Sequence, residues 1–136
     1  MQNQVKIFIS VLAVLVLGVI GTVIVRSNAT PPGPGVYDTF AQCIADSGTT
    51  FYGAFWCPHC QAQKKLFGSS AKLLPYVECS TPDGNGQTQA CIDKGIQSYP
   101  TWIMKDGTVL PNENGAGITL ETLAAKTSCQ LPAKGE

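Results

Sequence analysis

The chain has 136 residues, of which 44% are hydrophobic and 13% are charged, and its nine basic and nine acidic side chains leave no net charge. The basic residues are spread along the chain, with Lys64-Lys65 the only adjacent pair, whereas nucleic-acid binding needs a clustered basic face, so no nucleic acid is expected as a partner. Six cysteines in so short a chain are typical of proteins from an oxidising compartment.

Residues 1–26 are expected to form an N-terminal membrane anchor. The segment Ile7–Val25 reads IFISVLAVLVLGVIGTVIV and contains no charged residue, and a helix of that length is about long enough to cross a lipid bilayer. A cleaved signal peptide is the alternative, with Ser27-Asn28-Ala29 as its cleavage site. Because the apolar core of a signal peptide is usually only about 7–15 residues long, we favour an uncleaved anchor.

Residues 27–35, SNATPPGPG, are expected to form a stiff, extended linker, because proline cannot continue a helix. The remaining residues, 36–136, suffice for one domain. Lys6 and Arg26 flank the anchor on both sides, so basic residues do not fix its orientation. The cysteines favour a domain outside the cytoplasm, in the periplasm, at the cell surface or, in a photosynthetic organism, in a lumen. We therefore expect a single-pass protein with a cytoplasmic N-terminus.

Apolar periodicity and turn residues predict alternating helices and strands in this domain. In chain order they are a helix over 37–47, a strand over 50–55, a helix over 58–67, a strand over 74–79, a short helix over 87–94, a hairpin over 101–104 and 108–110, and a helix over 120–127. From residue 50 the order is β-α-β-α-β-β-α, with one extra helix before it. Strands joined by helices and a closing hairpin predict an α/β fold, with a mixed sheet and helices on both faces.

The stretch that carries chemistry is FYGAFWCPHCQAQ, residues 51–63, in which a strand leads into a helix that begins with Cys57, Pro58, His59 and Cys60. Proline suits the first helical turn. The positive end of the helix and the neighbouring His59 favour a thiolate at Cys57, which makes a disulfide there more oxidising. Two thiols at this spacing can close and reopen a small disulfide ring. Cys57 and Cys60 are therefore the candidate catalytic residues.

The Cys-x-x-Cys motif has two other possible interpretations. The motif can be half of a zinc site, but such sites usually need two further Cys or His ligands at a matching spacing, and the chain has no second pair of this kind. An inert structural disulfide gains little across so short a loop. The redox pair itself is expected to be the reactive centre, with no metal and no bound cofactor.

The other four cysteines, Cys43, Cys79, Cys91 and Cys129, allow three pairings. Cys79 ends a predicted strand and Cys91 lies in the short helix just after it, so these two can meet across the intervening loop. Cys43 would then join Cys129 and tie the first helix of the domain to the last. Both pairs are expected to be structural staples of a small core. The alternative is that one pair relays electrons, which requires it to lie within exchange reach of Cys57.

These motifs resemble a known fold. Strand, Trp-Cys-Pro-His-Cys and helix, with Tyr99-Pro100-Thr101 before a later strand, resemble the thioredoxin fold, and the Pro-His dipeptide is similar to that of DsbA-type oxidases. Over residues 40–129 the strings FYGAFWCPHC, LPYVECS, QTQAC and GIQSYPTW resemble the thioredoxin-like domain that bacteria and plants fuse to, or pair with, vitamin K epoxide reductase homologues.

The resemblance implies a role for several residues. Cys57 would be the exposed nucleophile and Cys60 the resolving thiol. Pro100, preceded by Tyr99, would follow a cis peptide bond, face the disulfide and align the substrate backbone. Trp56, immediately before the motif, would lie at the rim of the site and shape a docking groove.

One position departs from the pattern. Many thioredoxins bury an acidic residue six residues before the first motif cysteine, where this chain has Phe51, and no Asp or Glu occurs between Asp46 and Glu78. Such a carboxylate usually accepts the proton of the resolving thiol when a substrate is reduced. Its absence favours oxidation of substrates, with water as the alternative proton acceptor.

The expected function is that of a membrane-anchored thiol–disulfide oxidoreductase. The resemblance implies an oxidase that introduces disulfides into reduced, Cys-containing exported proteins and is reoxidised by a membrane-embedded, quinone-linked thiol oxidase of the vitamin K epoxide reductase type. One alternative is a disulfide reductase or isomerase that a membrane electron donor supplies. Another is a non-catalytic thioredoxin-like module that binds substrates in the groove beside Pro100.

Overall fold

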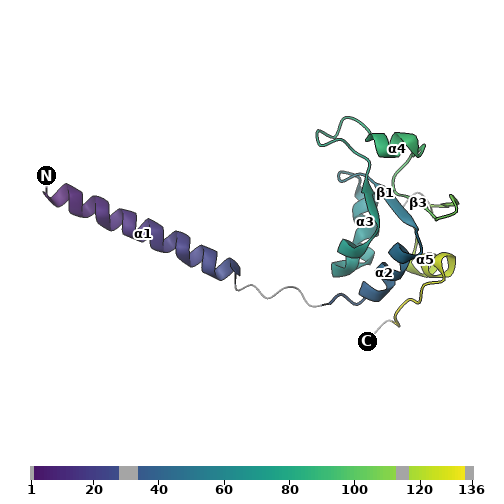
Figure 1. The fold of residues 1–136 in the computed structure, drawn as a ribbon, viewed down its shortest axis with the longest axis horizontal. Helices are drawn as coiled ribbons and strands as arrows, with labels where there is room; N and C mark the ends of the chain where they lie inside the picture. Colours follow the sequence, from purple (N-terminus) through teal and green to yellow (C-terminus); the bar gives the residue numbers. More distant parts are fainter. Residues whose placement is uncertain (1, 28–33, 113–116, 134–136) are drawn as a thin grey trace. The chain divides into compact units, whose positions relative to one another are not determined.

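The computed structural model describes residues 2–27, 34–112 and 117–133 and divides into two units, Met1–Gly33 and Pro34–Glu136 (Figure 1). In the first unit, α1 (Gln2–Ser27) is one continuous helix that starts before the predicted Ile7. Its segment Gln2–Ile20 has a mean hydropathy of 2.1, so this helix is long and apolar enough to cross a membrane. The predicted linker falls largely on residues 28–33, outside the described residues.

The described part of the second unit is a small α/β domain. Its elements, in chain order, are α2 (Asp38–Asp46), β1 (Thr50–Gly53), α3 (Pro58–Leu66), the 3-10 helix η1 (Gly68–Leu73), β2 (Tyr76–Glu78), α4 (Gln89–Asp93), β3 (Thr101–Ile103), β4 (Val109–Leu110) and α5 (Leu120–Thr127). The predicted order is confirmed, and η1 is the element that the sequence did not predict. The strands form one sheet in the order β2-β1-β3-β4, in which β1 and β2 run parallel and the other neighbours antiparallel.

β1 is shorter than predicted, and this changes the position of one aromatic residue. The chain leaves the sheet after Gly53 and makes a tight turn in which the Cys57 N–H donates to the Ala54 carbonyl at 3.0 Å. Phe55, the last residue of the predicted strand over 50–55 and therefore expected in its core, lies within this turn and is 49% exposed. The expectation was wrong because β1 ends at Gly53, two residues before Phe55.

Helices cover both faces of the sheet, as expected. Phe51 of β1 stacks on Trp102 of β3 with ring centroids 4.6 Å apart, and both belong to the main core with residues of α2, α3 and α5. Side chains alternate across a strand, so Tyr52 points to the opposite face, where it packs with Cys79, Cys91 of α4 and Ile96. The main core therefore lies directly behind the start of α3.

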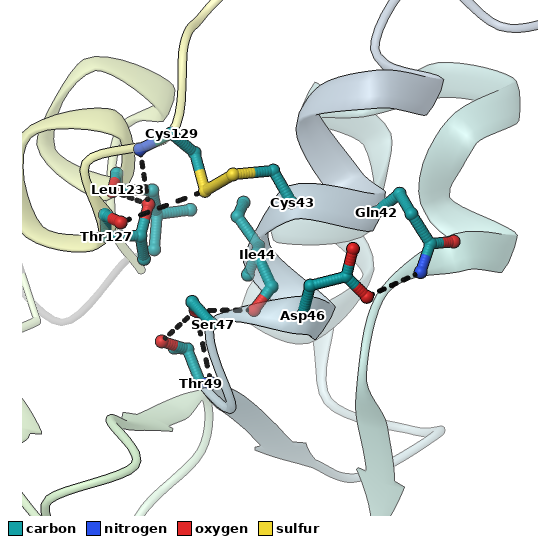
Figure 2. Close-up of a disulfide and its surroundings, with 9 residues drawn as sticks. All are labelled: Gln42, Cys43, Ile44, Asp46, Ser47, Thr49, Leu123, Thr127 and Cys129. Atoms are coloured by element: carbon teal, nitrogen blue, oxygen red, sulfur yellow. Dashed lines mark hydrogen bonds between the residues drawn. A yellow bond between two sulfur atoms is a disulfide. The ribbon is translucent and has the colours of Figure 1, made fainter.

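Two disulfides join elements that are distant in the sequence. Cys43 of α2 bonds Cys129, which follows α5, with their Cα atoms 5.8 Å apart (Figure 2). The Thr127 hydroxyl accepts from the Cys129 N–H at 3.4 Å and so fixes the end of α5 beside this bond. Cys79, just after β2, bonds Cys91 of α4 with a Cα separation of 5.5 Å. These are the pairs that the placement of the elements predicts.

Candidate active site

The turn after β1 places both motif cysteines at the start of α3. Cys57 is the N-cap residue with an extended backbone (φ −74°, ψ 118°), and Pro58 opens the helix, where its missing N–H leaves no unpaired donor. The first helical hydrogen bond runs from the Gln61 N–H to the Cys57 carbonyl at 3.1 Å. Cys57 and Cys60 are both free thiols in this structure. The geometry is therefore that of the reduced pair.

Cys57 is less accessible than the resemblance implies. It is only 5% exposed, and Cys60 is 1% exposed. The Cys57 thiol lies against the loop before β3, where it donates to the Tyr99 carbonyl at 3.7 Å. The expectation that Cys57 is exposed was wrong, because this loop lies over the helix start and covers most of the thiol. Cys57 remains the more accessible of the two thiols.

The covering loop is held from both sides. The Tyr99–Pro100 peptide bond is cis, as the resemblance implies. Gln87 donates to the Tyr99 hydroxyl at 2.7 Å, and Asn112 donates to the Pro100 carbonyl at 2.6 Å. These bonds fix the loop beside Cys57, and the Pro100 side chain within it is fully buried.

An aromatic rim borders the thiols. Trp56 is 50% exposed, yet its indole N–H donates to the Ser80 hydroxyl at 2.8 Å and its ring meets Tyr99 edge-on at 6.1 Å. Phe55 is its exposed neighbour. Trp56 thus occupies the rim that the sequence predicts, in one fixed orientation. His59 is also exposed, on the first turn of α3.

Burial sets the chemical state of the second cysteine. Loss of hydration raises the pKa of the Cys60 thiol to about 12, although a backbone hydrogen bond from Ala54 acts in the opposite direction. Cys60 is therefore a neutral thiol at physiological pH. It must lose a proton before it can attack and must regain one after it leaves.

A carboxylate reaches the site from the neighbouring strand. The parallel register pairs Gly53 of β1 with Glu78 of β2, and the Glu78 carboxylate accepts from the Tyr76 hydroxyl at 2.7 Å and from the Phe55 N–H at 3.2 Å. No acid lies at Phe51, as the sequence shows, and Glu78 is a half-buried carboxylate near the motif that sequence reasoning did not place there. The sequence reveals strands without their register, so it could not place Glu78 beside the motif.

Gln63 is a second residue that sequence reasoning missed. It is 1% exposed, and its amide donates to the Ile118 carbonyl at 2.9 Å and accepts from the Ile118 N–H at 2.7 Å. These two bonds fix the segment before α5 against α3. The sequence could not predict this contact, because a polar residue in an amphipathic helix is usually exposed and its partner lies 55 positions away.

The described residues offer no alternative centre of chemistry. Nowhere in the described part of the chain do three His, Cys, Asp or Glu side chains gather as a metal site would require. A cavity of about 390 Å³ lies between the ends of α2, α3 and α5, lined by Tyr37, Leu66, Leu120 and Leu131 among others, and neither motif cysteine lines it. Among the described residues, the free thiols Cys57 and Cys60 are therefore the candidate reactive groups.

The sheet order, the thiol pair at the start of α3 and the cis-proline in front of it define a thioredoxin-like domain. No family model matches the chain. It is 45% identical over 101 residues to thiol-disulfide oxidoreductase LTO1 of Arabidopsis thaliana. The aligned region covers 71% of this chain and 25% of that protein. It is also 29% identical over 99 residues to the thioredoxin domain-containing protein 5 homolog of Drosophila melanogaster. That aligned region covers 65% of this chain and 23% of that protein. The chain thus spans about a quarter of the length of the curated relatives it matches.

Proposed function

We propose that this protein is a membrane-anchored thiol–disulfide oxidoreductase that oxidises cysteine pairs in exported proteins. The observation that carries the proposal is the pair of free thiols at the start of α3, with Cys57 against the loop that holds the cis-proline and Cys60 buried still more deeply. The 45% identity to a thiol-disulfide oxidoreductase supports the same chemistry.

The exchange proceeds in two steps. A substrate thiolate attacks Cys57 Sγ of the oxidised pair, so that a substrate–Cys57 disulfide forms and the Cys57–Cys60 bond breaks with its electron pair on Cys60. A second substrate thiolate then attacks the substrate sulfur of this mixed disulfide and releases Cys57. The substrate loses two electrons and two protons, and the pair gains them. The cysteine pair is itself the redox centre, without a bound cofactor.

The position of the pair at the start of α3, with Pro58 and His59 between the two cysteines, supports the oxidising direction. The positive end of a helix favours the reduced form of such a pair, and stabilising the reduced form makes the disulfide more oxidising. We infer a membrane-embedded, quinone-linked thiol oxidase of the vitamin K epoxide reductase type as the partner that restores the disulfide. The apolar helix α1 would keep the domain near such a partner and raise its effective concentration.

The proposed topology has a cytoplasmic N-terminus and an extracytoplasmic domain. The disulfides Cys43–Cys129 and Cys79–Cys91 support it, since such bonds persist in oxidising compartments.

A second candidate is a reductase or isomerase on the same fold. The Tyr76–Glu78 pair favours it, because a reductase needs a proton acceptor for its resolving thiol. The two candidates differ in the direction of electron flow and share the catalytic cysteines.

The proposal is tested with the full-length protein in detergent micelles. The oxidised protein should oxidise a reduced, unfolded Cys-containing protein stoichiometrically. Mixed with a disulfide-bonded substrate, a reduced Cys60→Ser variant should accumulate the mixed disulfide, because Cys57 attacks the substrate disulfide and Cys60 is absent to displace the substrate, whereas Cys57→Ser should trap little. Equal trapping by both variants, or no oxidation by the wild type, would contradict the proposal.

A further inference from the structure

The buried position of Cys60 creates a need for a proton carrier. Cys60 is 1% exposed, so bulk water has little access to its sulfur. In each exchange its sulfur changes between thiol, thiolate and disulfide, and one proton must leave or return. A charged sulfur in so dry a place is unfavourable, which makes this proton transfer a candidate barrier.

We propose that Tyr76 and Glu78 carry this proton, with Glu78 accepting it through the Tyr76 hydroxyl when Cys60 attacks and returning it when Cys60 leaves. The proposal rests on the proposed exchange chemistry at Cys57 and Cys60. It holds for either direction of electron flow.

Gly53 is what lets the tyrosine approach the thiol. A β-carbon placed on Gly53 would lie 2.8 Å from Cys60 Sγ and 2.9 Å from Cε2 of Tyr76. Cys60 Sγ and Tyr76 Cε2 therefore both lie close to the same point beside Gly53. Cε2 is bonded to the ring carbon that carries the Tyr76 hydroxyl. Any side chain at residue 53 would separate them.

The hydrogen bonds around Glu78 orient the pair. The Tyr76 hydroxyl donates to Oε2 of Glu78 at 2.7 Å, which leaves the hydroxyl oxygen free to accept from a thiol. Oε1 of Glu78 accepts from the backbone N–H groups of Phe55 at 3.2 Å and Ser80 at 2.9 Å. These bonds hold the carboxylate at the half-buried end of β2, where it can exchange protons with water.

Charges on α3 support the transfer. The Lys64 ammonium lies 3.3 Å from the centroid of the Tyr76 ring, and its positive charge lowers the pKa of Cys60 against the effect of burial. His59 on the same helix is exposed, and Cys57 is the reaction partner. Burial and the bond to Glu78 raise the pKa of Tyr76 above its ordinary value, so the tyrosine passes a proton while remaining neutral.

The resolving step then balances as follows. The Cys60 proton moves to the Tyr76 oxygen while the Tyr76 proton moves to Glu78. Cys60 Sγ attacks Cys57 Sγ, the Cys57–Cys60 bond forms, and the bond from Cys57 to the substrate breaks, so the substrate leaves as a thiolate. In the opposite direction Cys60 leaves as a thiolate and takes the proton back.

The test uses the reduced full-length protein in detergent micelles and an aromatic disulfide that releases a coloured thiol. Stopped-flow absorbance separates two phases: Cys57 attack releases the first coloured thiol, and Cys60 attack on the resulting mixed disulfide releases the second. Glu78→Gln keeps a carbonyl oxygen for the Phe55 and Ser80 N–H groups but cannot take a proton. Tyr76→Phe keeps the ring beneath Lys64. Glu121→Gln, in the first turn of α5, is the matched control.

Both variants should slow the second phase by at least about tenfold at pH 7. General acid–base catalysis typically contributes about a hundredfold or more to a rate, so a loss of at least about tenfold is expected when the relay is removed. The first phase should be unchanged, and the control should match the wild type. In the variants the second-phase rate should rise with pH as hydroxide takes over the transfer. An unchanged second phase, or equal slowing of both phases, overturns the relay. Absence of a second phase in the wild type would overturn the exchange chemistry itself, and the relay with it.

Discussion

Two cysteines of one motif occupy different surroundings, and this difference explains how they divide the chemistry. Cys57 lies at the helix start and is 5% exposed, whereas Cys60 lies on the first turn of α3 and is 1% exposed, and both belong to the main core. The order of the two along the chain predicts these roles. The depth of burial does not follow from the motif, because the covering Tyr99–Pro100 loop comes from a distant part of the sequence.

The first prediction concerns alkylation of the reduced protein. Iodoacetamide should modify Cys57 at least about tenfold faster than Cys60 at pH 8, because the thiolate is the nucleophile and burial keeps Cys60 protonated. Peptide mass spectrometry at successive times measures the two rates. Equal modification of the two residues would contradict the assigned roles.

A second prediction at the residue scale concerns pH. Burial raises the pKa of Cys60 from its ordinary value of 9.0 to about 12, so between these values the unfolded chain loses a proton that the folded chain keeps. Below pH 9 this group has no effect on stability. Above it, the stability of the reduced protein should fall as pH rises toward 12.

Urea denaturation of the reduced protein from pH 8 to 11 measures this effect, with Cys60→Ser as the reference for other titrating groups. The wild type should lose more stability over this range than the variant does. Parallel curves for the two proteins would mean that Cys60 is not held as a neutral thiol by burial.

At the scale of elements, local signals predicted the helices and strands but not their contacts. Helix α5 has the predicted bounds, and it begins where the Thr119 side chain accepts from the Thr122 N–H. β1 ends at Gly53, where the chain turns toward α3, and the residues of the strand do not signal this early end. Glu78 could not be placed near the motif before the strand register was known, and the contact of Gln63 with Ile118 depends on how two distant segments pack.

The two disulfides give an element-scale prediction. The Cys43–Cys129 bond spans 86 residues and the Cys79–Cys91 bond spans 12, and the entropy lost by the unfolded chain grows with loop length. Replacing both cysteines of a pair by alanine should therefore cost about 4–5 kcal/mol for the first pair and about 3 kcal/mol for the second. Denaturant unfolding of the two double variants, with the active-site pair intact, gives both values. A larger loss for the shorter loop would contradict the loop-entropy account.

At the scale of the whole molecule, the chain joins an apolar helix to a thioredoxin-like domain. The sequence predicted both units, because a long uncharged run and a thiol motif between strand and helix are local signals. Partner and direction of electron flow depend on proteins outside this chain. They are therefore decided by the redox state that the domain holds in its own compartment.

The most direct measurement is the redox state of the Cys57–Cys60 pair in cells, read by rapid acid quenching and mass-tag alkylation of free thiols. The account predicts that most molecules carry the pair as a disulfide, and that the pair becomes reduced when the membrane oxidase is removed. A pair that is mostly reduced at steady state, and becomes oxidised when a membrane electron donor is deleted, would contradict the proposed oxidase and identify a reductase.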